Sequence, residues 1–229
     1  MPVRPTLNWA KRQVVSACRV PVLCGVIALS AGPAVGHPHV FVDGGVNFVF
    51  EDNSLVALDV TWLYDDFETL YMLSSYNLSL NANGELDEVD RRTLVRHRSN
   101  WPSDFDGSAH LSVGGQPASL QWPKDLNAQI VDGRLRVTFR RYLDEPVGLT
   151  GLAVEVAFYE STYFYTFAIT EQPLLIGSGS RCNEEVLKYD LTAQDQQMQA
   201  TLSRLSREET PAMADVGALF ADRIVMICA

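Results

Sequence analysis

The chain has 229 residues, of which 47% are hydrophobic and 20% are charged, with 28 acidic and 18 basic side chains. Four of the basic residues and none of the acids lie in residues 1–36, so residues 37–229 carry a formal charge of −14. A surface of that sign repels phosphate backbones, which argues against a nucleic-acid partner.

Residues 1–36 have the composition and order of a secretory signal peptide. A basic start without acids is followed by the apolar run Val20 to Ala31 and then by small residues. A bilayer-spanning helix needs roughly 20 apolar residues, so this run is too short for a membrane anchor. We expect export with cleavage after Gly36, or alternatively after Ala34, and no membrane span in the mature chain.

Residues 37–229 are predicted to form a single α+β domain, mostly antiparallel and sandwich-like. Residues 40–50 and 55–64 are rich in β-branched and aromatic side chains and predict a β-hairpin. A helical insertion is expected at about residues 65–100. It comprises one helix that Asp65 and Asp66 cap and that runs to about Tyr76, a polar loop, and a second helix over about 85–100.

Short strand patterns separated by turn residues follow the insertion and favour a sandwich. Asp132-Gly133 is a strong hairpin signal between two of them. A late helix is expected over about 190–207. The strands are expected at 111–113, 119–122, 129–131, 135–139, 152–159, 163–169 and 223–227.

Two cysteines, Cys182 and Cys228, lie beyond the signal region. An even pair in an oxidising compartment is expected to form a disulfide. Neither cysteine belongs to a C-x-x-C pattern, so we predict a structural bridge that ties the last strand to the domain.

His37-Pro38-His39 is the sharpest candidate for chemistry. In an extended segment, residues i and i+2 point to the same face, so both imidazoles could bind one divalent transition metal: nickel, cobalt, zinc or copper. Asp43, further along the same strand, could add a carboxylate. The competing interpretation is that two histidines near a terminus are incidental, because two imidazoles fall short of the usual three or four ligands.

The cleavage site decides which nitrogens are available. Cleavage after Gly36 gives His37 a free α-amine, as in the histidine brace that holds copper in some secreted proteins. Cleavage after Ala34 exposes Val35-Gly36-His37, which permits a square-planar site for copper or nickel. His97 and His110 are the remaining histidines, and nothing in the sequence connects either to the terminus.

The loop between the predicted helices has the spacing of an EF-hand calcium loop, with Gly84 at the sixth position. Few of its side chains are anionic, and Asp90 stands where a bidentate Glu is usual. These departures favour a structural turn over a calcium site. The candidate oxygen-bearing residues are Ser79, Asn81, Asn83, Glu85, Asp87 and Asp90.

Enzyme signatures are missing from the sequence. It contains no G-x-S-x-G, H-E-x-x-H, P-loop or G-x-G-x-x-G pattern. We therefore expect a protein that is not an enzyme.

Several segments together resemble domain-of-unknown-function family 1007. The resemblance rests on His37 to Asp43 after a signal, on segments 62–67, 81–87 and 159–164, and on the ending 219–228. It implies a bacterial periplasmic component of an uncharacterised transport system, associated with nickel/cobalt exporter-type membrane permeases. Family members commonly carry Asp-rich versions of the helical loop, from which this sequence departs.

Three hypotheses follow. The first is a periplasmic accessory protein that binds a transition metal through the N-terminal His-Pro-His and exchanges it with a membrane permease. The second is a structural or interaction module that docks on the permease while the histidines are incidental. The third and most remote is a copper oxidoreductase built on a histidine brace.

Overall fold

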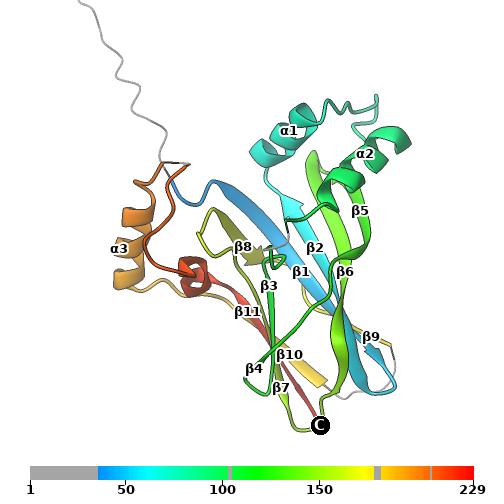
Figure 1. Ribbon diagram of the computed structural model, residues 1–229, viewed down its shortest axis with the longest axis vertical. Coiled ribbons are helices and arrows are strands. Elements are labelled where there is room, and N and C mark those ends of the chain that lie inside the picture. The colour runs from blue at the N-terminus through cyan, green and yellow to red at the C-terminus, as the bar shows by residue number, and fades with distance from the viewer. Residues whose placement is uncertain (1–35, 103–104, 178–181, 207) are drawn as a thin grey trace, which may run out of the picture. The chain divides into compact units, whose positions relative to one another are not determined.

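The computed structural model describes residues 36–102, 105–177, 182–206 and 208–229, which belong to one compact unit (Figure 1). The signal-peptide prediction falls, except for Gly36, outside the described residues. The fold is α+β, with two largely antiparallel sheets and helices outside them, as the sequence predicts. No helix among the described residues is both long enough and apolar enough to cross a bilayer.

The predicted N-terminal hairpin is confirmed. Strands β1 (Val40–Glu51) and β2 (Ser54–Tyr64) pair antiparallel. Asp52 and Asn53 at the turn both have positive φ, 46° and 63°. This backbone twist matches that of the flanking strands and is typical of the tightest hairpins, and Asn and Asp tolerate it better than other side chains.

The first sheet has the order β5-β6-β2-β1-β8, with β9 also alongside β1. The Asp132-Gly133 turn joins β5 and β6, as predicted. Strands β8 and β9 pair with β1 in parallel, which the local sequence pattern did not predict. The additional strands are β5 (Lys124–Val131), β6 (Arg134–Gly148), β8 (Tyr165–Ile169) and β9 (Leu175–Gly177).

The second sheet has the order β10-β11-β7-β3-β4. The predicted strand at 119–122 is wrong: the strand lies three residues earlier, and Leu120 makes only an isolated bridge to Leu143. The predicted disulfide is confirmed, between directly opposed residues of β10 and β11. The strands are β3 (Ala109–Val113), β4 (Gln116–Ala118), β7 (Ala153–Phe158), β10 (Cys182–Leu187) and β11 (Arg223–Cys228).

The main hydrophobic core contains side chains from both sheets, so they pack on each other as in a sandwich. From the first sheet it takes residues such as Phe48, Trp62 and Val137. From the second it takes residues such as Val156 and Ile224, all at most 3% exposed.

Helices α1 (Asp66–Ser75) and α2 (Glu88–Arg98) lie between β2 and β3 in the chain. Asp65 caps α1 as predicted, its carboxylate accepting the Glu68 N–H at 2.8 Å. The predicted start of the second helix near residue 85 is three residues too early, because Asp87 is the residue that caps α2.

Two short helices lie near the C-terminal end. Helix α3 (Ala193–Leu202) is shorter than the predicted 190–207, because Thr192 and Asp195 form a capping box that fixes its start. A 3-10 helix, η1 (Val216–Phe220), precedes β11.

Candidate functional site

The structure brings His37 and His39 together just before β1. Their ring centroids are 4.8 Å apart, and both rings contact the ring of Phe164, with centroids at 5.9 and 4.9 Å. The backbone N–H groups of His39 and Val40 both donate to the Phe164 carbonyl, at 2.9 and 3.2 Å. These two hydrogen bonds hold the histidine segment against Phe164, the residue that precedes β8. The peptide bond between His37 and Pro38 is cis.

The ring separation fits two imidazoles on one metal ion. With metal–nitrogen bonds of about 2.0–2.1 Å and bond angles of about 90–110°, two such rings have centroids about 4.5–5.2 Å apart. His37 is only 4% exposed, and its Nδ1 atom has no hydrogen-bond partner among the described residues. A buried ring nitrogen without a partner costs free energy that a ligand could recover. The donor set therefore suits a borderline-soft divalent metal.

Burial lowers the pKa of His37 below its ordinary value, while the nearby carboxylates of Glu160 and Glu209 oppose that shift. His37 is therefore neutral at pH 7, which is the form that binds metal. Glu160 is held in place: its carboxylate accepts the N–H groups of Thr162 and Phe164 at 3.0 and 2.9 Å. Sequence reasoning missed both carboxylates, because loops distant in the sequence bring them to the terminus.

His37 also borders a groove of about 480 Å³ between the start of β1 and helix α3. Phe41, Tyr163 and Gln199 are among the residues that line it. The histidine pair is thus beside an open surface, from which an ion could reach it.

Asp43 is not part of this cluster. Its carboxylate accepts a hydrogen bond from Arg134 Nη1 at 2.7 Å, and the same guanidinium donates to the Leu63 and Tyr64 carbonyls. In the described part of the chain, no three His, Cys, Asp or Glu side chains form a ready metal cluster. The structure thus brings together two of the three predicted metal ligands.

The other two histidines are each stacked on a tyrosine. His97 lies on Tyr76 with centroids 4.4 Å apart, and His110 lies on Tyr159 at 3.6 Å. Neither is near the histidine pair in the sequence, and neither takes part in a metal cluster among the described residues.

The EF-hand-like loop holds itself together by its own side chains. Asn81 Oδ1 accepts the N–H groups of Asn83 and Glu85, at 2.8 and 3.1 Å. Asp90 Oδ2 accepts the Ser79 N–H at 2.8 Å. Because these oxygens already have donors, the loop keeps its shape without a cation.

We therefore expect calcium to leave the stability of this loop unchanged. At 1 mM free calcium, about the range in which the weakest extracellular modules bind, the unfolding temperature should match that in EDTA. Differential scanning calorimetry checks this. A calcium-dependent rise, abolished by Asp90→Asn, would contradict the structural interpretation.

Residues 22–228 match the model of the family described as Protein of unknown function (DUF1007). The chain belongs to this family. Among curated proteins, it is similar to an uncharacterized protein of Haemophilus influenzae (strain ATCC 51907 / DSM 11121 / KW20 / Rd). The two are 20% identical over 199 residues, which is 85% of this chain and 92% of the relative. The family resemblance inferred from the motifs is confirmed.

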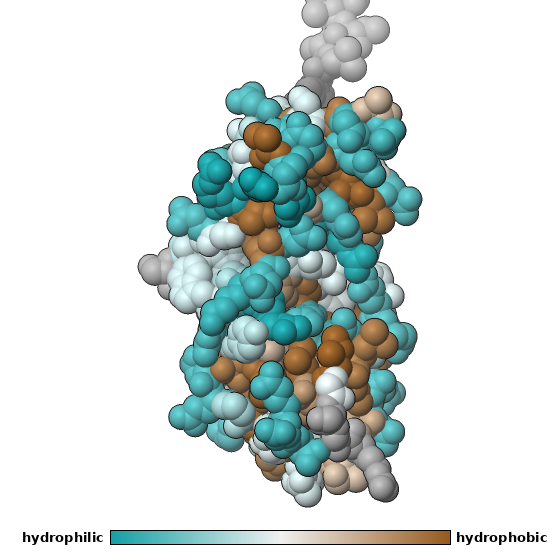
Figure 2. Space-filling model, turned by 90° about the vertical axis from the view of Figure 1, so that its right-hand side faces the viewer, coloured by the Kyte–Doolittle hydropathy of each residue, from teal (hydrophilic) through white to brown (hydrophobic). Residues whose placement is uncertain are grey.

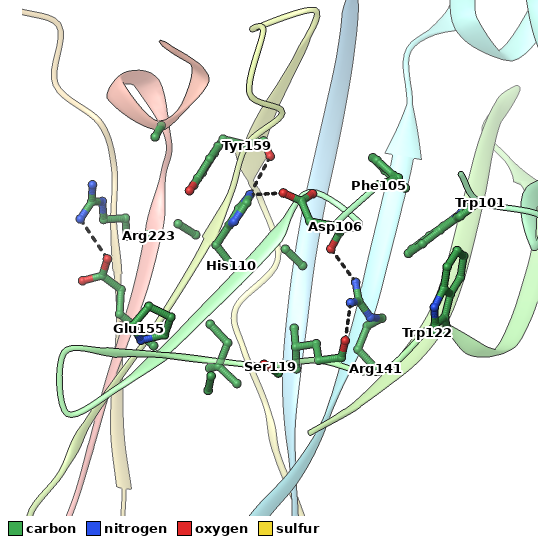
Figure 3. A pocket seen from close by; sticks show the side chains of 18 residues that line it. Trp101, Phe105, Asp106, His110, Ser119, Trp122, Arg141, Glu155, Tyr159 and Arg223 are labelled. Atoms are coloured by element: carbon green, nitrogen blue, oxygen red, sulfur yellow. Dashed lines mark hydrogen bonds and ion pairs between the residues drawn. The ribbon is translucent and has the colours of Figure 1, made fainter. Parts of the chain in front are cut away.

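This DUF1007 chain has a second feature, which no sequence motif reveals. In β6 the buried positions alternate, and the series Leu135, Val137, Phe139, Arg141, Leu143 places an arginine among them. A charged residue in phase with buried neighbours is the sequence signal that could have identified it. Arg141 lines a cavity of about 530 Å³ that Figure 3 shows from close by.

Proposed function

We propose that the protein is a non-enzymatic periplasmic accessory of a transition-metal transport system. It binds nickel, cobalt, zinc or copper through His37 and His39 and exchanges the ion with a membrane permease of the nickel/cobalt exporter type. The observation that carries the proposal is the convergence of the two imidazoles, 4.8 Å apart. The buried Nδ1 of His37, which has no hydrogen-bond partner among the described residues, supports it, because metal coordination would satisfy that atom.

The charges around the pair also support cation binding. Glu160 and Glu209 both act electrostatically on His37. The negative charge of these two carboxylates favours a divalent cation near His37. In the mature protein, cleavage after Gly36 would add the α-amine of His37 to the same position.

The proposal predicts stoichiometric metal binding that depends on both histidines. Mutating a residue that only hydrogen-bonds a metal ligand typically lowers metal affinity by about 10–100-fold. Removing an imidazole that binds the metal directly should therefore lower the affinity by at least about 100-fold. Titration of the exported protein with nickel, cobalt, zinc and copper by isothermal calorimetry measures this for His37→Ala and His39→Ala.

His97→Ala is the matched control. It removes an imidazole of α2 that is stacked on Tyr76, and it should leave the metal affinity unchanged. Equal metal affinity in all four proteins would refute the role of the pair.

A specific surface favours the second candidate, an interaction module that docks on the permease. On α1, Phe67, Leu70 and Tyr71 occupy one exposed face at helical spacing, with Phe67 85% exposed. Phe41 of β1 is also exposed, and two hydrogen bonds between Phe41 and Asp65 tie it to the start of the helix. Figure 2, which faces the side of the molecule that carries α1 and α2, shows hydrophobic side chains at the surface among hydrophilic ones. Exposed apolar clusters of this kind mark interaction sites.

Docking through α1 predicts position-specific contact with a membrane protein. A photo-crosslinking amino acid at position 67 in exporting cells should yield an adduct with the permease. The same group at position 174, where Leu174 is also exposed, should yield none. Adducts of equal yield at both positions would argue against a defined docking face.

A further inference from the structure

The largest cavity described above lies between β6 and the second sheet, at the turn that precedes β3. Its volume of about 530 Å³ falls within the range of about 300–1,000 Å³ that is usual for small-molecule sites. Trp101, Phe105 and Trp122 lie on one side of it, and His110 and Tyr159 lie on the other (Figure 3). The cavity is separate from the histidine pair and from the groove beside it.

Arg141 brings a buried positive charge to this cavity. It is 5% exposed, and its guanidinium donates to three backbone carbonyls: those of Asp106 and Leu120, both at 3.0 Å, and that of Gln121. A guanidinium has five N–H donors, so each terminal nitrogen keeps one N–H without an acceptor in the described part of the chain. The guanidinium forms no ion pair with a carboxylate of the described residues. Burial lowers its pKa, which the Asp106 carboxylate partly opposes.

The other polar groups that line the cavity already have partners. Arg223 pairs with Glu155 at 2.9 Å, and His110 Nε2 lies 3.1 Å from the Tyr159 carbonyl oxygen. Arg141 is therefore the charge that a ligand would complement. Bidentate, charge-assisted hydrogen bonds from a guanidinium to a carboxylate are among the strongest hydrogen bonds in proteins.

A cluster of aromatic rings lies on one side of this guanidinium. Its central carbon lies 5.5 Å from the ring centroid of Trp101, and the Trp101 ring lies 4.8 Å from Phe105 and 6.2 Å from Trp122. Trp122 is 51% exposed, although a large ring of this kind is usually well buried. Flat, half-exposed rings beside a cavity offer stacking surfaces to a planar ligand.

A glycine allows the guanidinium and the Trp101 ring to approach each other closely. Gly107 has a φ of +78°, and a Cβ at that position would lie 2.1 Å from Arg141 Nη1 and 2.7 Å from the Trp101 ring. Only glycine fits between the guanidinium and the indole at this turn. The close approach of charge and ring is thus built into the fold.

We propose that this cavity binds a small organic anion with a flat apolar body, namely an aromatic carboxylate. The carboxylate accepts hydrogen bonds from the two remaining N–H groups of Arg141. The apolar body packs on Trp101 and Trp122. This binding does not depend on the metal-binding function proposed above.

The test compares two probes of the same shape, 2-naphthoate and the neutral 2-naphthalenemethanol, by equilibrium dialysis with the full chain. A hydrogen bond to a charged group contributes about 1.5–3 kcal/mol, which corresponds to about 10–100-fold in affinity. We expect 2-naphthoate to bind more tightly by that factor. Indole N–H signals of Trp101 and Trp122 should shift in nuclear magnetic resonance spectra as it binds.

Two variants and one control locate the site. Trp122→Ala should weaken naphthoate binding about tenfold. Arg141→Met should bind both probes equally, and because Arg141 also holds three carbonyls, its folding is checked by circular dichroism. Phe67→Ala, on α1, should bind like the wild type. Absent naphthoate binding, equal binding of both probes by the wild type, or full affinity in Trp122→Ala would each overturn the proposal.

Discussion

Replacing Cys182 and Cys228 by serine should lower the free energy of unfolding by about 3–4 kcal/mol. The two cysteines are 46 residues apart in sequence and directly opposite each other in β10 and β11. The bridge restricts a long loop of the unfolded chain, which is the main source of its stabilising effect in the chain-entropy model. Chemical denaturation followed by circular dichroism measures the loss.

The effect should be concentrated in β10. This strand lies at the edge of its sheet, and most of its side chains are exposed, so few apolar contacts hold it in place. Hydrogen exchange should therefore accelerate in residues 182–187 before it does in β7 or β3. The wild type under reducing conditions should behave like the double variant. Equal stability of the oxidised and reduced forms would contradict this account.

Truncating Leu94 to alanine should cost about 2–5 kcal/mol, the usual cost of deleting a fully buried leucine side chain. Leu94 is 0% exposed, and it is the buried residue of α2 that joins the main hydrophobic core. Two polar contacts also join this helix to the sheet, Arg98 to Tyr64 at 2.7 Å and Arg91 to Asn127 at 2.9 Å. These contacts do not fill the space that the Leu94 side chain occupies, so they cannot replace it.

Val89→Ala provides the matched control on the same helix. Val89 is 71% exposed, so its truncation should change the free energy of unfolding by less than about 0.5 kcal/mol. Thermal or urea unfolding of both variants gives the comparison. Equal losses in the two would mean that α2 does not pack as the structure shows.

Local signals predicted the parts of the fold that neighbouring residues determine. The turns at Asp52-Asn53 and Asp132-Gly133 and the cap at Asp65 specify their elements within a few residues. Long-range pairing was not predictable in this way. Strands β8 and β9 pair with β1, a strand far from them in the sequence, so no local pattern could predict the pairing. Strand β10 was missed because its residues Asn183, Glu184 and Glu185 are polar.

The sequence also predicted only part of the candidate metal site. The spacing of His37 and His39 was sufficient to predict their convergence. The spacing of Asp43 was misleading, because its carboxylate forms an ion pair with Arg134 of β6. Glu160 and Glu209 reach the pair only through tertiary structure, so a sequence pattern cannot reveal them.

The most direct measurement of the central claim is X-ray absorption spectroscopy on the protein loaded with one equivalent of nickel or zinc. The account predicts the multiple-scattering pattern of two imidazoles per metal ion, reduced to one imidazole in either His37→Ala or His39→Ala. A metal environment without histidine, or one that both variants leave unchanged, would contradict it.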